Sequence, residues 1–383
     1  MFNSNLHIRA ITLLTIGLLV LSCSKNHQEQ LLFVGTYTGT GSEGIYAYRF
    51  NPDQGVLTSI GLVAKTVNPS FLIVDEKGKF LYAVNEVDSF QNTSSGALSV
   101  FAIHKETGDL ELLQQVSSLG AAPCHVSLDR SGRYLLAANY NGGNAVVFPL
   151  QSDGTLGEHT ALITNSGSGA NADRQTGPHA HFIQTTIDNQ FILHADLGTD
   201  EVVMNTFDAS SGKVEPMAHG KIQLAPGSGP RHLAFSPSGV YIYVLNELLS
   251  TVTVFEMKMT GVVTERQTVT TLGEHFTGTN TTAEVAMDAN GRFLYVSNRG
   301  DDSIIVYRID AGNGELSFVQ RISSGGKTPR HFEIDPSGQW LLAANQQSGN
   351  MALFRIDASN GTIKQETLVT GISAPVCVRF LTP

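Results

Sequence analysis

Cysteine is scarce in this chain, which has three cysteines in 383 residues, at Cys23, Cys124 and Cys377. None belongs to a CxxC pair, and no Cys/His spacing along the chain is typical of a zinc site. The sequence therefore argues against a structural zinc domain, and the few cysteines must be explained in another way.

Positive charge is also in short supply. The chain has 24 Lys and Arg against 34 Asp and Glu, which gives a formal net charge of -10. A protein this acidic is a poor general binder of nucleic acid, because its overall field repels the phosphate backbone. We therefore expect no nucleic-acid partner.

A long apolar run occurs at the N-terminus. Ala10 to Leu21 follow the positive Arg9, and this run is too short to span a bilayer comfortably but suits a secretory signal peptide. The run ends in VLSC, residues 20–23, which resembles the bacterial lipobox. The resemblance implies cleavage before Cys23 and lipidation of its thiol and new amino group.

These features predict an exported bacterial lipoprotein that is anchored to a membrane through lipid on Cys23. We expect residues 1–22 to be the signal peptide, residues 23–30 a polar tether and residues 31–383 the folded domain. The alternative is an ordinary signal peptide followed by an incidental cysteine.

One phrase recurs along the rest of the chain. GPRHLAFSPSGVYIYVLNE, residues 229–247, returns as TPRHFEIDPSGQWLLAANQ at residues 328–346, and weaker copies give a period of about fifty residues. Each copy reads as a strand, a PSG-type turn, a β-branched and aromatic strand, a third strand and, after a gap containing Gly, a more variable fourth. Sustained helical periodicity is lacking. The repeat predicts an all-β fold, a seven-bladed β-propeller with four-stranded blades.

The two ends of the folded domain are expected to complete one blade. Ala374 to Phe380 supply only a first strand, whereas Leu31 to Phe50 begin at the second-strand position. Pairing these segments leaves no open sheet edge, so residues 31–383 form one closed domain. Trp340 is the only tryptophan, which argues against the WD40 class. Cys124 and Cys377 fall on blades separated by another blade, so we expect free, buried cysteines.

Three common motifs for binding or catalysis are missing or incomplete in this sequence. GTGSEG, residues 39–44, precedes a strand where a dinucleotide site needs a helix, and GGKT, residues 325–328, lacks the first glycine of a phosphate-binding loop. No GxSxG is present, so a serine-hydrolase elbow is not indicated. We expect no cofactor. No convincing set of three metal ligands can be identified in the sequence. His and Glu residues expected near the axis of the propeller leave the presence of a metal ion open.

The repeat also predicts where functional side chains gather. First and second strands form a hairpin, so the start of the first and the end of the second lie on one face of the ring, and first strands line the axis. The variable side chains in these places are His125, His179, His181, Asp196, Arg231, His232, Glu247, Glu284, Arg299, Arg330 and His331. Guanidinium groups suit bidentate recognition of carboxylate or phosphate, so these positions predict a site for a small anionic organic molecule.

Asparagines recur in the same places without regard to the variable charges. They are Asn85, Asn139, Asn298 and Asn345. A polar residue that every blade repeats is explained by the architecture, so we expect these side chains to fasten neighbouring blades.

Six segments together resemble the lactonase family of seven-bladed β-propellers, which includes bacterial 6-phosphogluconolactonases and fungal carboxymuconate lactonizing enzymes. The segments are ADRQTGPHAHF, ADLGTDEV, GPRHLAFSPSG, NELLSTVTVF, FLYVSNRGDDSI and TPRHFEIDPSG, in this order. The resemblance implies lactone hydrolysis or its reversal by ring closure. Carried over by motif, the His, two Arg and Glu that cluster in the lactonizing relatives fall on one of His179 and His181, on Arg231 and Arg299, and on Glu247.

Lactone hydrolysis needs a base for water and donors for the oxyanion that develops on the carbonyl. We expect Glu247, or a neutral His179 or His181, to be the base, and Arg231 and Arg299 to hold the substrate and stabilise charge. The remaining candidates, Arg330, His331, Glu284, His232, Asp196 and His125, are expected to contact the substrate. We expect a monomer.

One departure from the family concerns the residue after SNRG, where many relatives have His and this chain has Asp301. The extra acid is expected to weaken phosphate binding, and export argues in the same direction against a phosphosugar substrate. Two other classes remain open: a ring-closing lyase of the carboxymuconate type, and a non-catalytic binding or scaffold propeller at the cell envelope.

Overall fold

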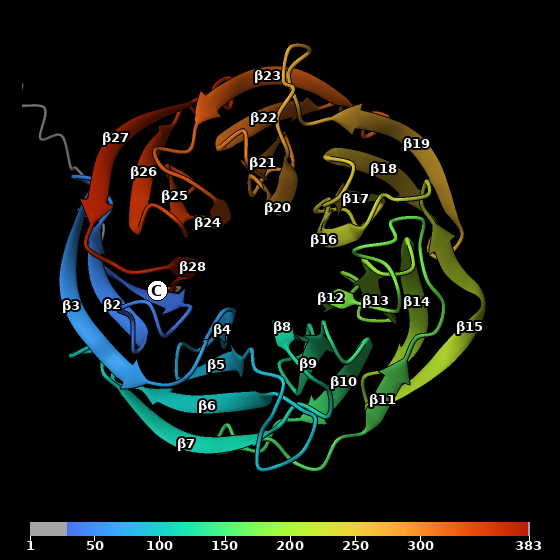
Figure 1. The fold of residues 1–383 in the computed structure, drawn as a ribbon, viewed down its shortest axis with the longest axis horizontal. Coiled ribbons are helices and arrows are strands. Elements are labelled where there is room, and N and C mark those ends of the chain that lie inside the picture. Colours follow the sequence, from blue (N-terminus) through green and yellow to red (C-terminus); the bar gives the residue numbers. More distant parts are fainter. Residues whose placement is uncertain (1–28, 382–383) are drawn as a thin grey trace, which may run out of the picture.

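The computed structural model describes residues 29–381. All the regular secondary structure in this range is β-strand. Seven four-stranded antiparallel sheets stand around a central axis (Figure 1). The predicted seven-bladed propeller is confirmed. Within the described range no helix has the length and apolar character that a membrane crossing needs. The expected signal peptide, Cys23 and most of the expected tether lie outside the described residues.

The first three blades follow one another along the chain. Blade one contains β4 (Leu72–Val74), β5 (Phe80–Asn85), β6 (Ala97–Ile103) and β7 (Leu110–Ser117). Blade two contains β8 (Pro123–Leu128), β9 (Tyr134–Asn139), β10 (Asn144–Pro149) and β11 (Ala161–Thr164). Blade three contains β12 (Ala180–Thr185), β13 (Phe191–Asp196), β14 (Glu201–Asp208) and β15 (Lys213–Gln223).

The next three blades repeat the same order from the axis outward. Blade four contains β16 (Pro230–Phe235), β17 (Tyr241–Asn246), β18 (Thr251–Met257) and β19 (Val263–Thr270). Blade five contains β20 (Thr281–Met287), β21 (Phe293–Arg299), β22 (Ser303–Ile309) and β23 (Leu316–Ser323). Blade six contains β24 (Pro329–Ile334), β25 (Trp340–Asn345), β26 (Asn350–Ile356) and β27 (Ile363–Thr370).

The seventh blade is built from both ends of the chain, as predicted. Its strands are β28 (Pro375–Phe380), β1 (Gln30–Thr36), β2 (Gly44–Asn51) and β3 (Val56–Lys65). β28 pairs antiparallel with β1, with Val378 opposite Val34. The C-terminal strand thus closes the ring and satisfies a backbone edge that would otherwise be open.

Neighbouring blades interlock through an aromatic side chain and a glycine turn. Tyr82, Tyr243 and Tyr295 each donate their hydroxyl proton to the carbonyl of a turn glycine in the next blade, at 3.0–3.1 Å. In blade six Trp340 takes this place and donates its indole N–H to Pro52 in blade seven at 2.8 Å. A Cβ on Gly55 would overlap the Trp340 ring, and its φ of 65° also favours glycine. The glycine before each fourth strand therefore serves the packing between blades.

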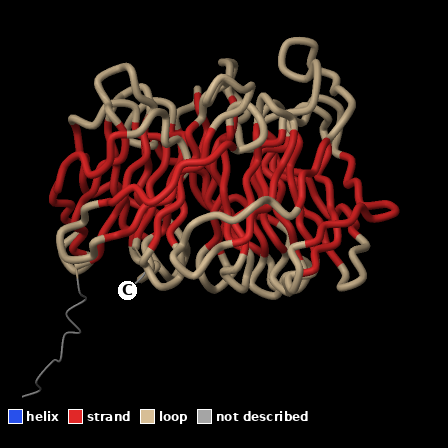
Figure 2. The backbone as a smooth tube through the Cα atoms, turned by 90° about the horizontal axis from the view of Figure 1, so that it is seen from below, coloured by secondary structure: helices blue, strands red, loops and turns tan. Residues whose placement is uncertain are grey.

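All first strands begin on the same face of the ring, here called the front face, and end on the back face. Loops cover both faces (Figure 2). On the front face Asn139, Asn298 and Asn345 donate their amide protons to the backbone carbonyls of Ser118, Thr271 and Ser324 at 2.8–3.0 Å, and Asn85 does the same to Val67 at 2.6 Å. Each acceptor lies on the segment that enters the blade from its predecessor, so the predicted fastening role is confirmed.

The two described cysteines behave as predicted. Cys124 and Cys377 are free and buried, at 5% and 0% exposure. Burial raises the pKa of both thiols, and the pKa of Cys377 reaches about 12. Neither thiol is therefore a nucleophile at neutral pH.

Candidate active site

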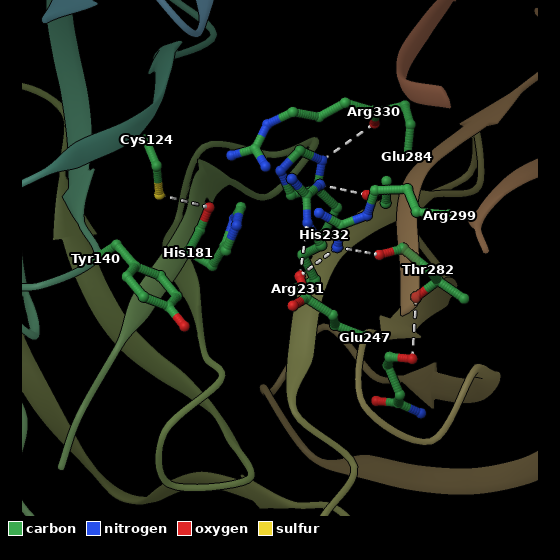
Figure 3. A network of polar contacts seen from close by, with 12 residues as sticks. Cys124, Tyr140, His181, Arg231, His232, Glu247, Thr282, Glu284, Arg299 and Arg330 are labelled. Atoms are coloured by element: carbon green, nitrogen blue, oxygen red, sulfur yellow. Dashed lines mark hydrogen bonds and ion pairs between the residues drawn. The ribbon is translucent and has the colours of Figure 1, made fainter. Parts of the chain in front are cut away.

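Three arginines converge on the carboxylate of Glu247 at the front face. Arg174 Nη2 lies 2.8 Å from Oε1, while Arg231 Nε and Arg299 Nη2 lie 3.1 Å and 2.8 Å from Oε2. Glu247 follows β17, Arg231 lies on β16, Arg299 ends β21, and Arg174 comes from the loop before β12. Figure 3 shows Arg231, Arg299 and Glu247 in one polar network. Two blades and one loop thus contribute to a single ion-pair cluster.

The protonation state of Glu247 follows from this arrangement. Burial by itself would raise the pKa of its carboxyl, but Arg299, Arg231 and Arg174 outweigh burial and hold the pKa at about 2. Burial and the neighbouring charges of Arg299 and Arg330 lower the pKa of Arg231 to about 10, so Arg231 still carries a charge at neutral pH. Glu247 is therefore a fixed anion that orients arginines, and such an anion is a weak base.

A second acidic group, Glu86, lies nearby and holds a fourth arginine less firmly. Its Oε2 accepts hydrogen bonds from the Tyr37 hydroxyl, at 2.7 Å, and from the Ser70 hydroxyl. The guanidinium of Arg330 lies 3.9 Å from the same oxygen and 5.2 Å from the centre of the Tyr37 ring. The Arg330 side chain is 17% exposed. Its guanidinium therefore keeps donors for a ligand.

We call Arg174, Arg231, Arg299, Arg330, Glu247 and Glu86 the front cluster. Its four guanidinium groups face two carboxylates, so positive charge exceeds negative charge by two at the face where the axis opens. Arg299 Nε is buried and has no hydrogen-bond partner among the described residues. This local excess in an acidic protein favours an anionic ligand, as the sequence predicted.

The two histidines of the GPHAH segment differ in position. His179 is half-buried, stacks on Tyr140 at 4.4 Å, and its Nδ1 lies 3.0 Å from the Tyr140 carbonyl oxygen. A carbonyl accepts, so Nδ1 is the donor of this contact, and in the tautomer that donates from Nδ1 the lone pair is on Nε2. His181 is buried at 4% exposure, and its Nδ1 has no hydrogen-bond partner within residues 29–381. Burial, with the nearby charges of Arg231, His232 and Arg330, holds the pKa of His181 well below its usual value.

A layer of six side chains lies behind the front cluster, and we call it the axial ring. Its members are Phe71, His125, Phe182, His232, Glu284 and His331. His232 Nδ1 lies 3.1 Å from Glu284 Oε1, and His331 Nε2 lies 3.5 Å from Glu284 Oε2. Burial lowers the pKa of the three imidazoles and raises that of the Glu284 carboxyl. The four polar members, His125, His232, Glu284 and His331, were predicted to contact the substrate, and they lie one layer behind the arginines.

The structure gives Asp196 a different place from the one expected. Its carboxylate accepts hydrogen bonds from the backbone N–H groups of His179 and Gly198, at 2.7 and 2.9 Å, and from Asn165 Nδ2 at 2.5 Å. Asp196 is completely buried. These contacts make it a fastener of the loop that carries His179, and they leave little of the carboxylate for a substrate.

Asp301, the departure from the family pattern, is paired within its own blade. Its carboxylate pairs with Arg321 Nη1 and accepts a hydrogen bond from Ser303 Oγ. Its charge is thus neutralised within blade five. The expectation that Asp301 weakens phosphate binding loses its physical basis, because the front cluster keeps its excess of positive charge.

Sequence reasoning missed Arg174, Tyr37 and Tyr140 as members of the site. Arg174 lies in the ADRQTGPHAHF segment, one of the six family-like segments, but outside the repeated strand slots that were searched. Its Nη2 also donates to the Tyr140 hydroxyl at 3.1 Å. Tyr37 follows β1 and reaches the site only because the two termini close the ring. No group of three or more His, Cys, Asp or Glu within residues 29–381 is arranged to hold a metal ion.

Comparison with known proteins identifies the family to which the chain belongs. The model of the family described as "Lactonase, 7-bladed beta-propeller" matches residues 31–380. A 6-phosphogluconolactonase of Bacillus subtilis is 36% identical over 301 residues, covering 78% of this chain and 83% of its own length, and one of Formosa agariphila is 32% identical, covering 79% and 85%. The solved structure of the periplasmic gluconolactonase PpgL of Pseudomonas aeruginosa superposes with a TM-score of 0.86 at 32% identity, over 93% of this chain and 99% of that one. The chain therefore belongs to the lactonase family of seven-bladed β-propellers.

Proposed function

We propose that the protein is a lactone hydrolase of the 6-phosphogluconolactonase type, which binds a small anionic lactone at the front cluster. The observation that carries this proposal is the excess of guanidinium groups beside a neutral, unpartnered imidazole, His181. Arginines supply binding and oxyanion stabilisation, and the imidazole supplies the proton acceptor. Relatives named 6-phosphogluconolactonase or gluconolactonase support the reaction class.

The reaction needs three roles from the chain. A water oxygen attacks the lactone carbonyl carbon while His181 accepts the proton that the water loses. Negative charge then develops on the carbonyl oxygen, where Arg231 and Arg299 Nε are the proposed donors. The ring C–O bond breaks, and the ring oxygen takes the proton from His181, which leaves an open hydroxy acid and a neutral imidazole.

His181 suits the role of base better than Glu247. The carboxylate of Glu247 has a pKa of about 2 and three arginine partners, so it would gain a proton only at a high cost. Burial is the main cause of the low pKa of His181, and Arg231 and Arg330 contribute. A substrate anion bound to these arginines offsets their charge and thereby makes the imidazole a better proton acceptor. His179, with its bare Nε2, is the alternative base.

Steady-state hydrolysis of glucono-lactone and of its 6-phosphate by the purified protein tests this proposal, with a muconate-type diacid as a third substrate. We expect both lactones to be hydrolysed. Arg330→Ala should raise KM for the phosphorylated lactone by about tenfold to a hundredfold, the value of a charge-assisted hydrogen bond. Arg266→Ala, which removes an exposed arginine from β19, is the control and should leave KM unchanged. Turnover of the diacid alone would assign a ring-closing reaction, and turnover of none would favour a binding propeller.

We also propose that the protein is exported and held on a membrane by lipid on Cys23. The apolar run before VLSC supports this location. The similar Pseudomonas aeruginosa structure is that of a periplasmic protein, which agrees with work outside the cytoplasm. An extracytoplasmic lactonase would meet lactones that come from outside the cell.

A further inference from the structure

A cavity lies on the axis, behind the axial ring. Its volume is about 290 Å³, and its lining includes all six members of the ring. The outer lining comes from residues further along the first strands, among them Gln184, Ala286, Glu333 and Arg379. Because first strands run from the front face to the back face, this cavity opens on the side opposite the front cluster. It is therefore separate from the proposed lactone site.

The floor of the cavity is aromatic and uncharged except at one residue. The rings of Phe71 and Phe182 each lie 4.4 Å from that of His125, and Phe182 lies 5.5 Å from His232. Burial lowers the pKa of the His125 and His232 imidazoles well below the usual value, so both rings are neutral at physiological pH. The floor is thus formed by aromatic rings, whose faces attract positive charge, and the guanidinium of Arg379 already lies 5.6 Å from the centre of the Phe71 ring.

Glu284 is the exception, and one of its oxygens lacks a hydrogen bond. Oε1 accepts from the Val285 backbone N–H at 3.1 Å and lies 3.1 Å from His232 Nδ1. Oε2 has no hydrogen-bond partner among the described residues, and Nε2 of the neutral His331 imidazole lies 3.5 Å from it. Glu284 is only 7% exposed. A buried acceptor without a donor is costly, so this oxygen favours a ligand that brings one.

The other charges at the cavity cancel each other. Arg379 Nη1 lies 2.7 Å from Glu333 Oε1, Arg379 Nε donates to the Leu72 carbonyl, and the other Glu333 oxygen accepts from the Phe380 backbone N–H. Arg379 is thus occupied by protein partners. The charge that a ligand meets is that of Glu284, which repels anions and attracts cations.

We propose that this back cavity binds a small organic cation, a protonated amine on an apolar body of about the size of benzylamine. The ammonium group donates to Glu284 Oε2, and the apolar body packs against Phe71, His125 and Phe182. Ligand pockets commonly combine apolar burial with a few placed polar groups, and aromatic faces add cation–π attraction. The front cluster and the back cavity then select ligands of opposite charge across one ring of side chains.

Isothermal titration of the purified protein with benzylamine at pH 7 tests the proposal, with benzyl alcohol and benzoate as the neutral and anionic probes of the same shape. We expect saturable one-site binding of benzylamine, weaker binding of benzyl alcohol and none of benzoate at this cavity. Glu284→Gln should weaken benzylamine binding by about tenfold or more, because the amide keeps the shape and loses the charge. Glu106→Gln, an exposed carboxylate in the turn after β6, is the matched control and should not change affinity.

Loss of folding in the Glu284 variant would leave the result ambiguous, so a second variant fills the cavity instead. Ala286→Phe places a ring among the lining residues and should abolish benzylamine binding while Glu284 stays in place. Absence of saturable benzylamine binding to the wild-type protein would overturn the proposal. Benzoate binding of equal affinity that Ala286→Phe abolishes, or benzylamine binding unchanged in both variants, would overturn it as well. Lactone turnover does not enter this test, so the two proposals fail independently.

Discussion

The position of Glu247 could be predicted from the sequence, but its chemical role could not. Its place in the NEL segment predicted a position close to Arg231 and Arg299, and the ion pairs of Glu247 with both arginines agree with this placement, because the repeat puts strand ends on one face. Its protonation state depends on how many arginines reach it, and Arg174 arrives from a loop that no repeat slot predicts. The sequence could therefore predict the members of the cluster from blades four and five, while the distinction between a base and an ion-pair anchor required the contacts.

This distinction predicts two different phenotypes. Glu247→Gln leaves Arg231 buried without its carboxylate, so it should lower the free energy of unfolding by about 3–5 kcal/mol, the usual cost of breaking a buried ion pair. Turnover should fall with it, because Arg231 and Arg299 lose their orientation. His181→Gln removes the proposed proton acceptor and should lower kcat by about 10² to 10⁴ with a smaller loss of stability.

Urea denaturation and lactone kinetics on the same preparations check both variants. The comparison contradicts the assignment if Glu247→Gln retains wild-type stability and loses only kcat. Glu247 would then be the base, as the sequence also allowed, and His181 a packing residue.

At the scale of elements, the sequence was most informative about first and second strands. HLAFS and YIYVLN in blade four carry apolar side chains on both faces, because inner strands are covered by neighbouring blades, and their pattern repeats closely. The outer strands, such as β19 and β27, consist mainly of exposed and half-buried residues and face solvent, so their sequences vary from blade to blade. Contacts between blades, such as Trp340 with the carbonyl of Pro52, join residues almost 290 positions apart and leave no local signal.

Ring closure predicts the outcome of a truncation after Gly371. Removal of β28 exposes the backbone edge of β1 and removes Val378 and Phe380 from the core shared by blades six and seven. We expect loss of a single cooperative unfolding transition and association through the open edge. Calorimetry and size-exclusion chromatography measure both effects, and removal of residues 382–383 alone is the control. A truncated chain that melts like the full chain would show that β28 is dispensable for closure.

At the scale of the whole molecule, the proposed lipid anchor predicts where the protein is found. Wild-type protein should fractionate with membranes and carry an acyl mass on Cys23, because several acyl chains on one residue bind a bilayer stably. Cys23→Ala should be released to the soluble fraction or remain unprocessed. Unchanged fractionation of the variant, together with no acyl mass on the wild type, contradicts the proposal.

The whole ring also carries a set of buried imidazoles that makes its stability depend on pH. His125, His181, His194, His232 and His331 are all at most 5% exposed, and burial lowers the pKa of each, to about 4 for His194 and about 3 for His331. In the unfolded chain a histidine has a pKa of about 6.5. Below that pH the unfolded state takes up protons that the folded state refuses, so the free energy of unfolding falls as pH falls. Buried Glu284 and Glu333, whose pKa values are raised by burial, oppose this trend, because the folded state binds protons at these carboxyls more readily than the unfolded state does.

Urea denaturation at pH 7.5, 6.5 and 5.5 should therefore show a stability that declines with a slope steeper than about 1.4 kcal/mol per pH unit, the value for one proton. His194→Gln should make the slope shallower by about one proton, since this imidazole lies on β13 away from the front cluster and its removal leaves the arginines in place. His104→Gln changes an exposed imidazole and should leave the slope as it is. A stability that does not change between pH 7.5 and 5.5 would mean that the five buried imidazoles accept protons in the folded state. In that case His181 and its neighbours would be charged near neutral pH, and a neutral imidazole base would no longer explain the chemistry proposed for the front face.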